Sequence, residues 1–184
     1  MNVEAEILEL RKAIQEIRDR QAILDCLVRE ARGRDRFDAA MTASCYWEDG
    51  ADEHGPSVTP GPVYGERANA GHRAGFSANC HNLANFSCEI DGDVANCETY
   101  VIGGLLSPDQ KTCKVAFGRY IDRLERRQGQ WKIKLRRSIV DMAAEGDASW
   151  LKTPALSGFL KGVRSKADPS YQRPIELNAG DARW

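Results

Sequence analysis

The sequence predicts an α+β domain in which helices come first and a long antiparallel sheet follows. Apolar residues recur every three or four positions over residues 4–31, which is the period of a helix with one apolar face. Two runs of alternating apolar and polar side chains flank Asp91-Gly92, the strongest short signal for a tight hairpin. Two further alternating runs are joined through Gln128-Gly129-Gln130. Helices followed by consecutive strands favour the α+β class.

The composition is that of one ordinary globular domain with a tail. Of 184 residues, 42% are hydrophobic and 29% are charged. The 26 basic and 27 acidic residues nearly cancel, so no overall basic field is present and we expect no nucleic-acid partner. The start lacks a signal-peptide pattern, and no run reaches the roughly 18 apolar residues of a membrane span. We therefore expect a cytoplasmic protein without a membrane partner.

The six cysteines form no C-x-x-C pair, and several lie inside apolar strand patterns. They are Cys26, Cys45, Cys80, Cys88, Cys97 and Cys113. This placement favours small buried side chains that stay reduced over a disulfide framework or a zinc site.

The first predicted helix, residues 4–31, carries an apolar stripe interrupted only by Gln21. The apolar members are Ile7, Leu10, Ile14, Ile17, Leu24 and Val28. The spacing is heptad-like but too short for a free-standing coiled coil, so the helix should pack on the domain or on a neighbouring subunit. Gly33 is the expected terminator, and a second short helix containing Met41 should follow Asp35.

In the middle of the chain, prolines and glycines, which interrupt helices and strands, indicate where each element ends. An aromatic-rich strand comes after the second helix and ends in a polar loop. Three prolines and several glycines predict a longer loop over residues 55–67. Residues 66–78 should be helical, although Gly71 and Gly75 weaken the pattern.

The predicted sheet centres on the hairpin from Cys80 to Ile102, with two more long strands over residues 112–127 and 131–142. Outward charges on those two strands indicate a sheet with one wet face. We assign residues 1–145 to the domain and residues 146–184 to a C-terminal extension. The extension is rich in apolar residues and should form a short amphipathic helix that packs on the sheet, a pocket mouth or another subunit.

One of the three histidines, His81, stands at the entry of the central hairpin beside an apolar run. Asp35 has two interpretations: it could cap the second helix, or it could face inward and hold a histidine ring. His72 should be on the surface. His54 and Asp52 could share a face, but their spacing with His81 is not that of a metal site, and we expect no metal.

Arg136 and Arg137 are consecutive on the last strand, so their side chains point to opposite faces. An inward arginine needs a carboxylate partner or an anionic ligand, because an unpaired buried charge is costly. Sequence motifs of serine hydrolases, Walker loops and dinucleotide-binding folds are absent.

Taken together, these elements resemble the SnoaL-like family of the nuclear-transport-factor-2-like superfamily. The resemblance covers about residues 15–145. It rests on D-R-Q-A-I-L-D-C-L-V-R-E-A-R-G-R-D-R-F-D, on H-N-L-A-N-F-S-C-E-I-D-G-D-V-A-N-C-E-T-Y-V-I and on G-R-Y-I-D-R-L-E-R-R-Q-G-Q-W-K-I-K-L-R-R-S-I-V-D. It implies a cone: a strongly curved sheet wrapped around the N-terminal helices, with an apolar cavity closed by the C-terminal segment.

Within that family the chain is most similar to a lyase branch of dehydrochlorinases and dehydratases. The resemblance implies an Asp–His dyad of Asp35 and His81, with Arg136 as a cavity arginine. Glu30 stands where relatives place a lysine or tyrosine that assists the leaving group. The remaining substrate-binding candidates are five aromatic residues and one histidine: Tyr46, Trp47, Tyr64, Phe86, Tyr100 and His54.

The expected activity is elimination of water, halide or an aldehyde from a small hydrophobic substrate, without metal or organic cofactor. Neutral His81, oriented by Asp35, would be the general base. Three alternatives remain: an isomerase or cyclase on the same dyad, a non-catalytic ligand carrier, and the small subunit of a ring-hydroxylating dioxygenase. The resemblance also implies a homo-oligomer, with a trimer favoured.

Overall fold

The computed structural model describes residues 3–177 and 182–184 and divides the domain into three α-helices and six strands. In chain order these are α1 (Val3–Asp35), α2 (Ala39–Ser44), β1 (Tyr46–His54), β2 (Ser57–Pro60), α3 (Gly61–Gly75), β3 (Ala78–Asp91), β4 (Val94–Leu106), β5 (Thr112–Arg127) and β6 (Gln130–Asp147). Two short 3₁₀ turns, Ser149–Lys152 and Pro169–Tyr171, follow in the C-terminal extension. The predicted α+β class is confirmed.

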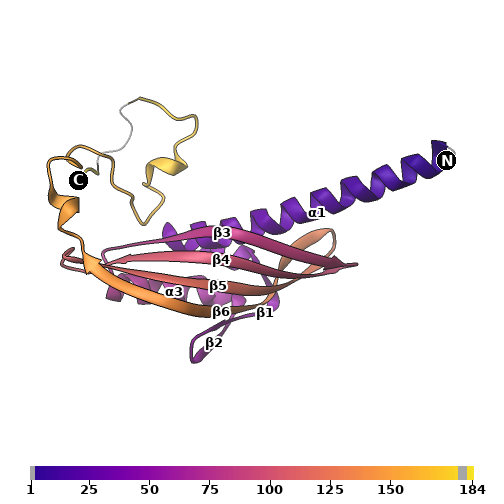
Figure 1. Cartoon of the computed structure of the whole chain (residues 1–184), viewed down its shortest axis with the longest axis horizontal. Coiled ribbons are helices and arrows are strands. Elements are labelled where there is room, and N and C mark those ends of the chain that lie inside the picture. The colour runs from indigo at the N-terminus through magenta and orange to yellow at the C-terminus, as the bar shows by residue number, and fades with distance from the viewer. Residues whose placement is uncertain (1–2, 178–181) are drawn as a thin grey trace.

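The sheet has the strand order β2-β1-β6-β5-β4-β3, and its long strands sweep in a curve past α1 and α3 (Figure 1). Every neighbouring pair is antiparallel except β1 with β6, which run parallel. The sheet is therefore mixed and not closed into a barrel. Its core contains Ile23 and Leu27 of α1, Tyr64 of α3, and Leu124 and Ile133 of the sheet, all buried. The helices thus cover one face of the curved sheet.

The two predicted hairpin turns are both present. Asp91 pairs with Val94, and Gly92 between them has φ +57°, a left-handed conformation that glycine adopts without strain. At the turn between β5 and β6, Gln128 and Gly129 have φ +53° and +77°. These turns set the register of the four longest strands.

The first helix is longer than predicted, because Gly33 does not end it. Gly33 is buried inside α1, and a Cβ there would lie 2.3 Å from Thr42 Oγ1. Glycine therefore allows α1 and α2 to pack closely, and the helix continues to Asp35. The N-cap of α2 is Asp38, which accepts a hydrogen bond from the Met41 amide at 3.1 Å, so of the two interpretations of Asp35 the helix cap is excluded.

The loop predicted over residues 55–67 is also wrong, because it contains β2 and the first turn of α3. Pro60 ends β2, an edge strand on which a missing amide costs no ladder bond, and it also caps α3. Pro62 then lies in the first turn of α3, where its fixed φ suits a helix.

Over its described residues, 146–177 and 182–184, the C-terminal extension contains no amphipathic α-helix. Trp150 and Phe159, expected on its apolar face, are 64% and 63% exposed. The extension is nevertheless attached to the helices: Arg164 Nη1 donates to the carbonyl of Phe76 at 2.8 Å, and the Tyr171 hydroxyl donates to Asp38 at 3.1 Å. None of the helices described is long and apolar enough to cross a membrane.

Candidate active site

The end of α1 and the start of β3 bring Asp35 and His81 into contact. Asp35 Oδ1 lies 2.6 Å from His81 Nδ1, and Oδ2 accepts the backbone amide of His81 at 2.9 Å. The Asn79 side-chain amide donates to Oδ1 at 3.1 Å. Because a carboxylate only accepts, the proton of this short contact belongs on Nδ1, and Nε2 is left as the basic nitrogen.

The local pattern of β3 explains this arrangement. Asn79 and His81 are two residues apart on a strand, so both side chains point to the face that α1 covers. Asp35, the last residue of α1, is 9% exposed. The helix end and one strand face therefore fix the dyad without any loop.

His81 also faces a small cavity of about 130 Å³ between the helices and the sheet. The lining is mostly apolar and comes from β1, α3 and the four long strands: His54, His72, His81, Val101, Gly103, Leu105, Ala116, Gly118, Tyr120, Ser138, Ile139 and Val140. A second cavity of about 240 Å³ shares His54 and His72 and adds Arg34 and Tyr64 to its wall. An apolar chamber with a few polar groups at one end is the usual form of a small-molecule site.

The electrostatics of the cavity lower the pKa of His81. Burial lowers the pKa of His81, and the nearby Arg34 guanidinium lowers it further, while the hydrogen bond to Asp35 acts in the opposite direction. A neutral imidazole can accept a proton at pH 7. The dyad therefore has the protonation state that a general base requires.

His72, predicted to lie on the surface, instead faces the cavity. Its ring centroid lies 5.4 Å from that of His81, and burial lowers the pKa of His72 to about 4. Its Nδ1 is buried without a hydrogen-bond partner among the residues that the structure describes. This is the main polar group of the cavity that sequence reasoning missed, since the glycines of α3 obscured which face of that helix is buried.

Behind the cavity lies a buried network of charges. Arg136 donates from Nε to Asp122 at 2.7 Å and from Nη1 to Glu30, while Arg34 Nε lies 2.7 Å from the other oxygen of Glu30. Arg34 also donates to the Tyr120 hydroxyl at 3.1 Å, and the Arg136 guanidinium stacks on the Tyr120 ring at 4.3 Å. All five side chains are at most 4% exposed.

This network changes the expected roles of two residues. Arg136 and Glu30, predicted to touch substrate, line neither cavity, because each is held by opposite charges behind Tyr120. Burial raises the pKa of Glu30, but Arg34 and Arg136 more than offset it and the net shift is downward. Glu30 is therefore ionised and cannot protonate a leaving group. The arginines that reach a cavity wall are Arg34 and Arg67.

The other predicted lining residues fall into two groups. His54 and Tyr64 reach the cavities and contact each other, with the Tyr64 hydroxyl 3.2 Å from His54 Nδ1. Tyr46 instead donates to buried Asp52 at 2.8 Å. The remaining three side chains also lie elsewhere: Trp47 donates to the Glu125 carbonyl, Phe86 packs on the core, and Tyr100 is 45% exposed.

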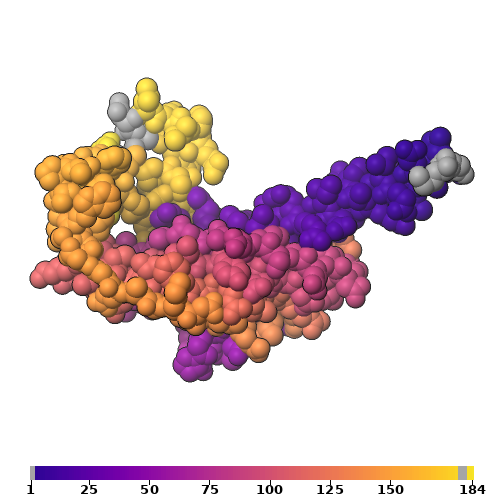
Figure 2. Space-filling view, in the orientation of Figure 1, coloured from indigo at the N-terminus to yellow at the C-terminus, as the bar shows by residue number. Residues whose placement is uncertain are grey.

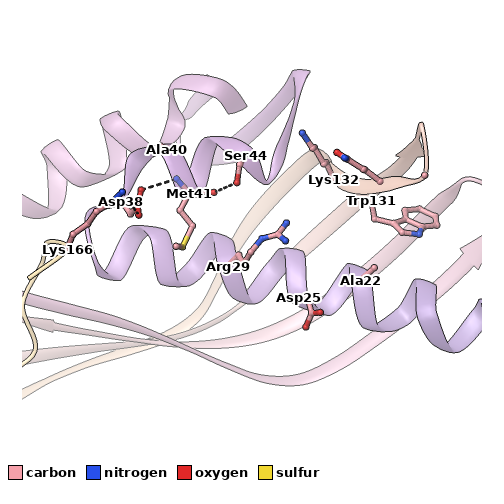
Figure 3. Close-up of a pocket in the computed structure, with 12 residues that line it drawn as sticks. Ala22, Asp25, Arg29, Asp38, Ala40, Met41, Ser44, Trp131, Lys132 and Lys166 are labelled. Atoms are coloured by element: carbon pink, nitrogen blue, oxygen red, sulfur yellow. Dashed lines mark hydrogen bonds and ion pairs between the residues drawn. The ribbon is translucent and has the colours of Figure 1, made fainter. Parts of the chain in front are cut away.

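A surface depression of about 840 Å³ is separate from the dyad. Figure 3 shows Arg29 and Asp25 of α1 below it, Met41 and Ser44 of α2 above, and Lys132 near the turn between β5 and β6. It is open to solvent, and its lining contains both acidic and basic side chains. It therefore lacks the apolar enclosure of the cavity beside His81. Within the described parts of the chain, no group of His, Cys, Asp or Glu is placed to hold a metal ion.

Comparison with known proteins identifies the family. The SnoaL-like domain is matched by residues 15–137, more than half of the chain. The chain belongs to the SnoaL-like family. Its fold is similar to hexachlorocyclohexane dehydrochlorinase type 3 from Novosphingobium barchaimii, with a TM-score of 0.68 and 20% identity over 73% of this chain and 94% of that one.

Two further solved structures share the SnoaL-like fold. A scytalone-dehydratase-like protein from Novosphingobium aromaticivorans gives a TM-score of 0.65 at 19% identity, over 72% of this chain and 90% of that one. An Asp-to-Asn variant of a protein of unknown function from Mycobacterium tuberculosis gives a TM-score of 0.62 at 29% identity, over 70% of this chain and 75% of that one. A comparison with curated proteins gave no match. The domain match confirms the predicted family, and these structural likenesses confirm the predicted fold.

Proposed function

We propose that this protein is a cofactor-independent lyase that removes a small leaving group from a hydrophobic substrate bound beside His81. The observation that carries the proposal is the position of neutral His81, which Asp35 holds at the wall of an apolar cavity. The reactions named for two structural relatives, dehydrochlorination and dehydration, are both eliminations, and they support the same class here.

The proposed step starts with proton transfer to His81 Nε2 from a carbon or hydroxyl group of the substrate. The electron pair of the broken bond forms a new double bond, and the leaving group departs with the pair that bound it. Asp35 stabilises the imidazolium and keeps the ring in place. The proton then leaves with the product or to solvent. A general base contributes about 10²–10⁴-fold, so desolvation and positioning in the cavity supply the rest.

Tyr120 is the best-placed acid for the leaving group. Its hydroxyl accepts a hydrogen bond from Arg34, so its own hydrogen remains available to the cavity that it lines. Burial raises the pKa of Tyr120, which keeps the hydroxyl protonated at neutral pH. This gives Tyr120 the assistance that relatives obtain from the lysine or tyrosine at the position of Glu30, and it leaves Arg136 as the charge behind Tyr120.

The shape of the site limits the substrate. A cavity of about 130 Å³ that adjoins one of about 240 Å³ accommodates a small, mostly apolar molecule. We expect aromatic, polycyclic or halogenated compounds with a leaving group next to an acidic proton. We also expect that no nucleic acid takes part, because the net charge of −1 provides no attractive field.

A mass-resolved turnover screen tests this proposal. Wild type, His81→Ala and the control Asn82→Ala are incubated with such substrates, and products are identified by mass. Asn82 is the next residue on β3 and is exposed, so its replacement should leave turnover unchanged. Loss of water, halide or formaldehyde by wild type and Asn82→Ala alone supports the lyase. A product of unchanged mass would indicate an isomerase or cyclase instead, and equal binding without turnover in all three proteins would indicate a carrier.

A further inference from the structure

The N-terminal half of α1 stands away from the body of the molecule, as the indigo segment in Figure 2 shows. Every residue over 3–18 is exposed. The face of α1 that packs on the domain begins only at Asp19 and continues through Ile23 and Leu27. A helical segment as short as residues 3–18 has marginal stability in water when nothing packs on it. We therefore expect the protruding half of α1 to have a partner.

An apolar stripe runs along the opposite face of the same helix. We call it the outer stripe, and it consists of Ile7, Leu10, Ile14, Ile17, Gln21, Leu24 and Val28. Leu10 and Ile17 are 57% and 67% exposed, and Val28 is 47% exposed although it lies beside the domain. No segment that the structure describes covers the outer stripe over residues 3–18. The stripe is therefore available to another chain over residues 3–18 and again at Val28, while Leu24 is half-buried.

The spacing of the outer stripe is a strict heptad pattern with alternating steps of three and four residues. Ile7, Ile14 and Val28 occupy a positions, and the d positions are Leu10, Ile17 and Leu24, two of which are leucine. β-Branched residues at a with leucine at d favour two parallel strands, and a polar a residue such as Gln21 helps to fix the register. We propose that the outer stripe is a dimerisation surface, on which a second copy of this chain forms a parallel two-stranded coiled coil.

Charge complementarity supports the parallel arrangement. In a parallel coiled coil, a g residue faces the e residue five positions later on the other helix. Glu6 at g would then face Arg11 of the second copy, which is an opposite charge. The other charged g residue, Arg20, is held on its own chain by Glu16 and the Cys88 carbonyl. In an antiparallel pair with Ile14 opposite Ile17, Arg11 would approach Arg18, which are like charges. The charges thus select the parallel form.

Light scattering of the full chain tests the dimer. Wild type should have twice the 20.5 kDa mass of one chain, and Ile14→Asp should have the mass of one chain. The matched control is Leu8→Asp, an apolar residue that is also exposed, at 53%, but lies outside the outer stripe. It should stay dimeric. Neither position contacts the domain, so both variants should fold, which circular dichroism checks. A wild-type mass of one or three chains, or an unchanged mass in Ile14→Asp, would overturn the proposal.

Exchange of two charges tests the direction of the helices. Within the described chain, Glu6 and Arg11 have no ion-pair partner, so each can be reversed without breaking an existing contact. Glu6→Arg and Arg11→Glu should each weaken dimerisation about tenfold, because two like pairs replace two opposite pairs. An equimolar mixture should recover the wild-type affinity as a heterodimer. Failure of the mixture to recover would exclude the parallel register.

Discussion

Both oxygens of Asp35 hold His81, one at the ring nitrogen Nδ1 at 2.6 Å and the other at the backbone amide at 2.9 Å. A single carboxylate thereby fixes the position of the strand and the orientation of the ring. The imidazole cannot rotate without losing the shorter of these bonds. Because Asp35 ends α1, the position of the proposed base follows the position of that helix.

Replacement of Asp35 by asparagine should lower kcat about 10²–10⁴-fold, because the amide no longer enforces the Nδ1–H tautomer or stabilises the imidazolium. Nitrogen NMR of the His81 ring should show a changed tautomer. The control is Asp38→Asn, which keeps an N-cap residue of equal quality on α2. Full activity in Asp35→Asn with an altered ring tautomer would remove Asp35 from the mechanism.

The activity should depend on the protonation of His81. Its pKa is lowered from the usual value of 6.5, so the basic form is present at pH 7 and is lost only on acidification below that value. We expect kcat/KM to be flat near neutral pH and to fall on an acid limb with an apparent pKa below 6.5. A pH–rate profile of wild type measures it. An acid limb centred above 6.5 would contradict the burial of the ring.

The stability of the fold should depend on the protonation of His72. Its pKa in the folded chain is about 4 against 6.5 in a solvated ring, so the unfolded chain binds the proton first. Stability is therefore complete above pH 6.5 and falls as pH drops toward 4. The partial exposure of the ring reduces the effect to about 2 kcal/mol.

Urea denaturation at several pH values should detect this loss in wild type, and His72→Asn should show a smaller slope between pH 6.5 and 4. Equal slopes in the two proteins would mean that His72 is solvated in the folded state. Because the two rings lie 5.4 Å apart, the difference in slope reports the titration of His72 together with its coupling to His81.

The buried charge network should dominate stability. Arg136→Met leaves Glu30 and Asp122 without a shared partner and should lower the free energy of unfolding by about 3–5 kcal/mol. The neighbour Arg137 offers a matched control, since it pairs with Glu53 at 2.8 Å but is 58% exposed. Arg137→Met should cost at most about 1 kcal/mol. Denaturant unfolding measures both variants, and similar losses would show that the network is open to solvent.

Much of the sheet could be predicted from the sequence, because the signals are local. The Asp91-Gly92 turn and the alternation on either side of it define β3 and β4 through neighbouring residues alone. The segment from Gly55 to Arg67 could not be predicted this way. Its prolines suggest a loop, yet Pro60 lies on an edge strand and Pro62 lies in the first turn of a helix. Both placements depend on the position of these segments in the tertiary fold.

The site was less accessible to sequence reasoning than the sheet. Asp35 and His81 are 46 residues apart, and only the family resemblance pointed to their pairing. Arg136 was correctly expected to need a carboxylate if it faced inward, but the sequence does not reveal that Asp122 on the neighbouring strand provides it. Contacts between distant elements, such as Gly33 against Thr42, also decided where α1 ends.

The parallel pairing of β1 with β6 has a consequence for synthesis on the ribosome. Asp52 of β1 pairs in register with Arg136 of β6. The edge of β1 that faces β6 therefore has no strand partner until almost the whole domain has been synthesised. Asp35 and His81 emerge much earlier, whereas Ser138, which helps to enclose them, emerges near the end. A nascent chain can therefore join the dyad before any chamber surrounds it. Until β6 arrives, the unfinished sheet exposes an apolar face that chaperones recognise.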